Sequence, residues 1–126
     1  MPVRVVVVED NDVFREALVL LLGHHPDVEV VGDVLGGEEA IDLCRREAPD
    51  VVLLDYRLPG MDGVQTTAAL KAVAPSAAVV CLTASATRRE KEAFVEAGAV
   101  AVLTKDAPLD EIADAIVKAA RAAAPR

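Results

Sequence analysis

Short apolar runs along the chain alternate with longer segments in which apolar residues recur at the spacing of a helical turn. The runs are nearly continuous in valine, leucine and alanine, which is typical of parallel strands buried on both faces of a sheet. Most of them are therefore expected to be inner strands. The runs predict five strands, at residues 4–8, 28–32, 51–54, 78–82 and 101–104.

A helix is expected after each strand. In the first of these segments, Phe14, Leu18 and Leu22 recur at helical spacing. The segment opens after Asp12 and stops near Gly23, where polar residues and a proline follow. The segment at 88–97 is the most polar of the five and is expected to be largely exposed. The later helices are predicted at residues 38–47, 64–73, 88–97 and 109–122.

The regular alternation of strands and helices predicts an α/β fold with helices on both faces of a parallel sheet. Five strand and helix pairs favour a doubly wound, flavodoxin-like sheet with strand order 2-1-3-4-5 and five helices. In such a sheet, ligands bind outside the carboxyl ends of the strands. The residues that follow each strand are therefore the first candidates for a functional site.

Composition narrows the class of protein. The 126 residues suit one domain, and no apolar run approaches the roughly 18 residues that cross a bilayer, so we expect a cytoplasmic protein without a membrane span. A formal net charge of -8 would repel nucleic acid, so this domain alone is not expected to bind DNA. Cys44 and Cys81 lie in apolar or helical stretches, and we expect buried thiols rather than a disulfide or a zinc site.

Polar residues that can carry chemistry follow four of the five predicted strands. If the strand order is as predicted, these strands bring their polar residues to one edge of the sheet. Ser85, near the end of the fourth strand, is expected to be an ordinary loop residue. The candidates are Glu9 and Asp10 after the first strand, Asp55 at the end of the third, Thr83 after the fourth and Lys105 after the fifth.

Three converging carboxylates would repel one another, and a hard divalent cation best explains such a cluster. Magnesium is the expected ion, with Asp10 and Asp55 as direct ligands and Glu9 acting through water. A carboxylate can attack phosphorus, and the charge that then develops on the phosphoryl oxygens needs cations and hydrogen-bond donors. Asp55 is the expected nucleophile, because it ends the central strand before a tight turn, while Lys105 and Thr83 would stabilise the developing charge.

Four segments in the expected order resemble the receiver domain of two-component response regulators: 8–11 (VEDN), 53–63 (LLDYRLPGMDG), 82–84 (LTA) and 103–105 (LTK). The resemblance covers essentially the whole chain and implies a CheY-like fold that binds magnesium. The roles it implies are an acidic metal pair (Glu9, Asp10), a phosphoacceptor (Asp55), a switch hydroxyl (Thr83), a phosphate-contacting lysine (Lys105) and a backbone carbonyl that ligates the metal (Arg57).

The segment 105–111 (KDAPLDE) resembles the NarL/FixJ subfamily, whose members usually continue into a LuxR-type helix-turn-helix domain. The resemblance implies a receiver domain at residues 1–122, with 123–126 as the start of a linker to an output domain outside this sequence. A sensor histidine kinase is the implied phosphoryl donor, and a homodimer is one implied state of the phosphorylated chain. DNA would be contacted only through the output domain. The chain would catalyse only phosphotransfer and dephosphorylation at its own Asp55, and is not expected to be an enzyme otherwise.

Two departures from the family pattern keep alternatives open. Asp106 follows the lysine where many receivers have a cis proline, and Val102 stands where the family commonly has an aromatic switch residue. A stand-alone or atypical receiver that acts as a protein-interaction module is therefore an alternative. A phosphatase of the haloacid dehalogenase type is another, but that chemistry usually needs a second carboxylate two residues after the nucleophile, where this chain has Arg57.

Overall fold

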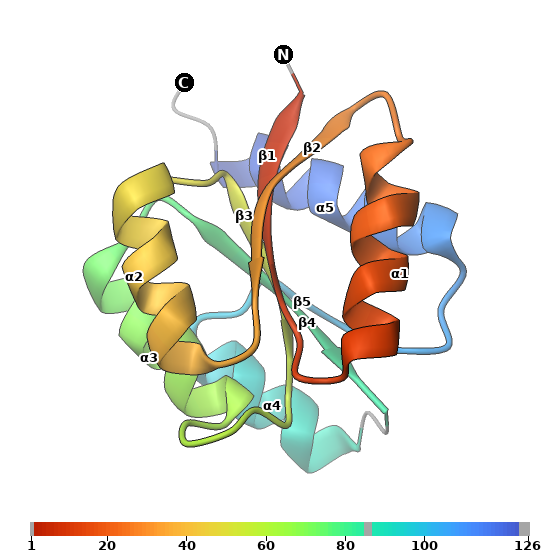
Figure 1. The fold of residues 1–126 in the computed structure, drawn as a ribbon. Helices are drawn as coiled ribbons and strands as arrows, with labels where there is room; N and C mark the ends of the chain where they lie inside the picture. Colours follow the sequence, from red (N-terminus) through yellow and green to blue (C-terminus); the bar gives the residue numbers. More distant parts are fainter. Residues whose placement is uncertain (1, 85–86, 124–126) are drawn as a thin grey trace.

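A computed structural model describes residues 2–84 and 87–123 of the chain. Strands and helices alternate along the whole of this part, as the hydrophobic pattern predicts (Figure 1). The elements are β1 (Val3–Val8), α1 (Asp12–Gly23), β2 (Val28–Val34), α2 (Gly37–Glu47), β3 (Val51–Asp55), α3 (Gly63–Val73), β4 (Ala78–Thr83), α4 (Arg88–Ala97), β5 (Ala101–Thr104) and α5 (Leu109–Ala123).

The five strands form one parallel sheet in the order β2-β1-β3-β4-β5, which confirms the predicted topology. The strands are in a register that aligns their carboxyl ends. Val8 pairs with Leu54 across β1 and β3, and Asp55 pairs with Leu82 across β3 and β4. The residues that end or follow these strands therefore emerge at one edge of the sheet.

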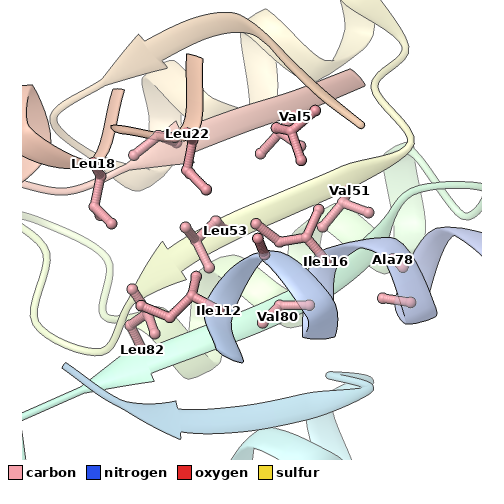
Figure 2. Packing of buried hydrophobic residues seen from close by; sticks show 14 residues of the cluster. Val5, Leu18, Leu22, Val51, Leu53, Ala78, Val80, Leu82, Ile112 and Ile116 are labelled. Atoms are coloured by element: carbon pink, nitrogen blue, oxygen red, sulfur yellow. The ribbon is translucent and has the colours of Figure 1, made fainter. Parts of the chain in front are cut away.

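Helices α1 and α5 cover one face of the sheet, and α2, α3 and α4 cover the other (Figure 1). On the first face, Leu53 of β3 packs among Leu22 of α1 and Ile116 of α5 (Figure 2). On the second face, Leu54, the next residue along β3, packs in a separate cluster with Phe94 of α4. Successive residues of a strand point to opposite faces, so two covered faces require an apolar residue at every position. This requirement explains why the inner strands appear as unbroken apolar runs.

The bounds of several elements differ slightly from the predicted ones. The strand predicted at 28–32 continues to Val34, because Asp33 and Val34 still pair with the end of β1 although the apolar run has stopped. Pairing at a sheet edge does not need a buried side chain, so the apolar pattern underestimates this strand. Helices α2 and α3 begin one residue earlier than predicted, at Gly37 and Gly63, and α5 reaches Ala123. Residues 124–126 of the expected linker lie outside the described part of the chain.

Helix α4 is mostly exposed, as its polar sequence predicts, but Phe94 anchors it to the sheet with no exposed surface. Within the described residues, none of the helices is both long and apolar enough to cross a membrane. Cys44 and Cys81 are buried free thiols, as expected.

Candidate functional site

Four strands deliver the predicted site residues to the same edge of the sheet. Glu9 directly follows β1, Asp55 and Thr83 are the last residues of β3 and β4, and Lys105 directly follows β5. Backbone hydrogen bonds extend the sheet into this edge. The amide of Glu9 donates to Val34 at 3.0 Å, and the amide of Lys105 donates to Thr83 at 2.9 Å. The side chains of the site therefore start from a rigid backbone.

The carboxylates of Glu9, Asp10 and Asp55 form a tight acidic cluster. One oxygen of each lies within 4.8 Å of the others. Glu9 and Asp55 are buried, with exposed fractions of 1% and 5%, whereas Asp10 is exposed. Burial raises the pKa of Glu9 and of Asp55 above the ordinary carboxyl values, and repulsion between the carboxylates adds to this effect. The ionised form of the cluster therefore requires positive charge close by.

Lys105 supplies one positive charge to this cluster. Its Nζ lies 2.8 Å from Oε1 of Glu9 and 3.2 Å from Oδ2 of Asp55. Partial burial of the ammonium acts to lower the pKa of Lys105, but the two carboxylates outweigh burial and leave the pKa raised. The lysine therefore stays charged at neutral pH. When all three carboxylates are ionised, one ammonium leaves the cluster with net negative charge.

A cavity of about 280 Å³ opens beside Asp55 and Lys105. Since a water molecule takes about 30 Å³ in the liquid, the cavity has room for a tetrahedral oxyanion. Thr83, which is buried, and Arg57, which is exposed, line the same cavity. The cavity is lined by Asp55, Tyr56, Arg57, Thr83, Ala84, Glu90 and Lys105.

The structure thus brings together all six residues that the sequence nominates. Glu9, Asp10, Asp55 and Lys105 meet in one charged cluster, and Arg57 and Thr83 line the adjoining cavity. Ser85 lies outside the described residues.

The donor set fits a divalent cation with oxygen ligands. Oε2 of Glu9 accepts a hydrogen bond from the amide of Asn11 at 3.0 Å. Oε1 is buried and is paired with the ammonium of Lys105 at 2.8 Å. Asp10 and Asp55 present further carboxylate oxygens at the same place. Hard cations such as magnesium prefer such oxygens, and a cation there would relieve the repulsion between them.

Sequence reasoning missed two residues near the site. The ring centroid of Phe14, which the sequence indicates only as an apolar residue of the first helix, lies 4.8 Å from Nζ of Lys105. Glu90, which belongs to the segment 88–97 that was expected to be largely exposed, lines the cavity. Phe14 could have been found from its place in the first turn of α1, three residues after the helix cap Asn11, because that turn begins at the edge of the sheet where the site lies. The position of Glu90 depends on how α4 packs, which its own sequence does not specify.

The structure shows the surroundings of Asp106 and Val102, the two residues that depart from the family pattern. The described residues contain no cis peptide bond, and the turn after Lys105 is closed by other contacts. The amide of Ala107 donates to Thr104 at 3.0 Å, and the Thr104 hydroxyl bonds to the Asp106 carboxylate. Val102 is half-buried and packs against the apolar cluster on the face covered by α2, α3 and α4.

The sequence matches a known protein family and is similar to two transcriptional regulators. A sequence model of the family described as "Response regulator receiver domain" matches residues 5–117. The chain is 38% identical over 119 residues to the "Probable transcriptional regulatory protein NarL" of Mycobacterium tuberculosis strain H37Rv, covering 94% of this chain and 55% of that protein. It is 33% identical over 119 residues to the "Transcriptional regulatory protein LiaR" of Bacillus subtilis strain 168, covering 94% of this chain and 56% of that protein.

Solved structures show the same likeness. The signal receiver domain of the putative response regulator NarL from Mycobacterium tuberculosis superposes with a TM-score of 0.90 at 38% identity, covering 95% of this chain and 97% of that one. The chain spans about half the length of the curated relatives that it matches.

Proposed function

Because this chain belongs to the response regulator receiver domain family, we propose that it is a phosphorylation switch in which Asp55 accepts a phosphoryl group from a sensor histidine kinase. One observation carries this proposal. The carboxylates of Glu9, Asp10 and Asp55 and the ammonium of Lys105 converge beside a cavity that can hold an oxyanion. A site of this composition suits transfer of a phosphoryl group to a carboxylate, since it combines a nucleophile with groups that stabilise phosphoryl charge.

The acidic cluster, which is typical of the magnesium site of receiver domains, would hold the ion through Asp10, Asp55 and the backbone carbonyl of Arg57, with Glu9 acting through water. When bound, magnesium supplies positive charge that neutralises the carboxylates and the phosphoryl oxygens. The buried carboxylates support this assignment, because the single ammonium of Lys105 leaves their repulsion incompletely balanced.

In the proposed transfer, a carboxylate oxygen of Asp55 forms a bond to the phosphorus of a phosphohistidine on the kinase. The phosphorus–nitrogen bond breaks, its electron pair stays on the imidazole nitrogen, and that nitrogen takes up a proton from water. Lys105 neutralises charge on one phosphoryl oxygen, and the Thr83 hydroxyl donates a hydrogen bond to another. Both side chains line the cavity that adjoins Asp55, which supports these roles. Later attack of water on phosphorus would return Asp55 to its free carboxylate.

We also propose that residues 1–122 are the receiver part of a cytoplasmic transcriptional regulator, and that residues 123–126 begin a linker to a LuxR-type helix-turn-helix domain. The similarity to NarL and LiaR, which are named as transcriptional regulators and of which the matched region covers 55% and 56%, supports the proposal. Phosphorylation would change a partner surface of the receiver, with pairing of two receivers as one outcome, and DNA would be contacted only by the output domain. The coding sequence downstream of residue 126 tests the continuation directly.

The experiment that tests the switch is incubation of the chain with acetyl phosphate, with magnesium or with EDTA, followed by intact mass measurement. We expect a gain of one phosphoryl group that requires magnesium and is absent in the Asp55→Asn variant. Asp50→Asn is a matched control, since Asp50 is exposed and bonds to the backbone of Arg4 outside the site. Gain of the group by Asp55→Asn, or no gain by the wild type in any condition, would refute the proposal.

Val102 favours one second candidate, a receiver that acts as a stand-alone or atypical interaction module. The residue fills part of an apolar cluster, and no aromatic ring is available at this position of β5 to change its orientation on phosphorylation. Beryllofluoride, which mimics a bound phosphoryl group, separates the two candidates. Chemical-shift changes in α4 and β5 on adding it with magnesium support the switch, whereas shifts confined to the site support the module.

A further inference from the structure

We propose that Phe14 is a positioning residue for Lys105, with its ring face holding the lysine ammonium at the mouth of the phosphoacceptor site. This inference rests on the proposed function of Asp55 and Lys105. It adds a residue of α1 to a set otherwise drawn from the ends of the strands. The interaction is a cation–π contact, in which the negative face of an aromatic ring attracts a nearby cation.

Among the described residues, the ammonium of Lys105 has three partners. Its Nζ lies 4.8 Å from the centroid of the Phe14 ring, 2.8 Å from Oε1 of Glu9 and 3.2 Å from Oδ2 of Asp55. The lysine side chain is 24% exposed, so water covers only a small part of it. Cation–π attraction is stronger for such a partly desolvated cation than for one at an open surface.

The position of the ring is tied to the acidic cluster through the backbone. Oε2 of Glu9 accepts from the amide of Asn11 at 3.0 Å, and Oδ1 of Asn11, the cap of α1, accepts from the amide of Phe14 at 2.9 Å. The ring in turn faces Lys105, which pairs with Oε1 of Glu9. These contacts form a closed circuit through four residues, which ties the backbone of Phe14 to the Glu9 carboxylate and places its ring beside the ammonium.

Apolar side chains guide the stem of the lysine toward this circuit. A groove of about 170 Å³ between α1 and the start of α5 is lined by Phe14, Leu18 and Leu109 together with Lys105 itself. The aliphatic part of a lysine packs on apolar walls while its charged end seeks polar or aromatic partners. The alternative is that Phe14 has only a packing role in this groove. In that case a leucine at position 14 would support phosphorylation equally well.

A neutral partner suits the chemistry proposed for Lys105. When Asp55 becomes an acyl phosphate, the oxygen bonded to phosphorus no longer carries carboxylate charge, and the ammonium has to turn toward the phosphoryl oxygens. An aromatic ring attracts the ammonium without a proton or a metal, so it can remain a partner before and after transfer. It thus limits the movement of Lys105 to a short swing from Asp55 to the phosphoryl group.

The test replaces Phe14 by stop-codon suppression with 4-fluoro-, 3,5-difluoro- and 3,4,5-trifluorophenylalanine, and by mutation with leucine. Fluorine withdraws electrons from the ring and weakens its attraction for a cation with little change in size. We expect the rate of magnesium-dependent phosphorylation by acetyl phosphate to fall stepwise along the series. The trifluoro ring should be slower than phenylalanine by about two- to fivefold, and leucine should be at least as slow.

A second readout does not involve phosphorylation. The ring current of Phe14 should shift the ε-methylene proton resonances of Lys105 upfield in the NMR spectrum of the wild type, and Phe14→Leu should abolish this shift. The matched control is the same fluorine series at Phe94, the other phenylalanine of the chain, which packs edge-on against Tyr56 with ring centroids 5.5 Å apart. This series should not produce a graded loss of rate.

The outcomes are distinguishable. A graded loss of rate at position 14, with unchanged urea unfolding midpoints and a shifted Lys105 resonance, supports the role of Phe14. A flat series in a chain that is phosphorylated, or the absence of a ring-current shift in the wild type, overturns that role and leaves the proposed function intact. No phosphorylation of the wild type overturns both.

Discussion

Replacement of Gly63 by alanine is expected to destabilise the chain and to disturb the phosphoacceptor at the same time. Gly63 is the first residue of α3, and it packs directly against the end of β3. A Cβ at this position would lie 2.6 Å from the backbone oxygen of Asp55, 2.8 Å from Cα of Tyr56 and 3.1 Å from Cε1 of Phe94. Two of these atoms belong to the backbone, so a side-chain rotation cannot relieve the overlap.

The size of the effect follows from two opposing contributions. Overpacking of a closely packed site costs about 1–3 kcal/mol. Alanine recovers up to about 1 kcal/mol relative to glycine inside a helix, and less at the first position. The net loss is then about 1–2 kcal/mol, which corresponds to roughly 3–10 °C in Tm for a domain of this size. Because the backbone of Asp55 has to move, the rate of phosphorylation should also fall.

Urea unfolding followed by far-UV circular dichroism measures the loss of stability, and intact mass measures the rate of phosphorylation. Gly23→Ala is the matched control, because its Cβ would meet nothing within 4 Å at the end of α1. We expect this control to be neutral or slightly stabilising and to react at the wild-type rate. A Gly63→Ala chain as stable as the control would refute the close approach of α3 to the phosphoacceptor.

Two further predictions concern charge and burial. Lys105→Met removes the cation between Glu9 and Asp55. In EDTA it should lower the free energy of unfolding, measured by urea melts, by about 1–3 kcal/mol, a value reduced because the ammonium is partly exposed. Added magnesium should restore part of this loss. Burial raises the pKa of the Cys44 thiol to about 11 and that of Cys81 to about 12, so both should resist Ellman's reagent at pH 8 and react fully in urea. Rapid reaction of the folded chain would contradict the burial. Since these folded pKa values exceed the unfolded value of 9.0, the protonated thiols favour the folded state. Their contribution to the free energy of unfolding is complete below pH 9 and is lost as pH rises through 11 and 12.

The positions of the inner strands could be predicted from the sequence because both faces of the sheet are covered. Every position of β3, from Val51 to Asp55, is buried, so the strand appears in the sequence as a continuous apolar run. The edge strand β2 was predicted two residues too short, since Asp33 needs only a backbone partner there. Backbone hydrogen bonding in an edge strand does not require apolar side chains, so the hydrophobic pattern does not predict its full length.

The candidate site could be predicted for a related reason. The polar residues Glu9, Asp55 and Lys105 interrupt or follow apolar strands, and the parallel order of the strands places their ends together. Phe14 and Glu90 could not be assigned to the site in this way. Both lie on helices, where a residue's neighbours depend on how the helix is rotated and tilted against the sheet. Topology locates strand-end residues directly. For a residue in the first turn of a helix, such as Phe14, topology gives only the edge of the sheet near which it lies, and packing decides its contacts.

The geometry of the site depends as much on the starts of helices as on the ends of strands. Asn11 caps α1 and links it to Glu9, while Asp62 and Thr87 begin capping boxes at the starts of α3 and α4. Each cap fixes a first turn that contacts the site: α1 through the Phe14 ring, α3 through its close approach to Asp55, and α4 through Glu90 in the cavity wall. The side chain of an N-cap residue contributes about 0.5–2 kcal/mol to stability. Here its loss would also release a turn that holds a charged group in place, so substitutions at these caps should impair the site more than their effect on stability implies.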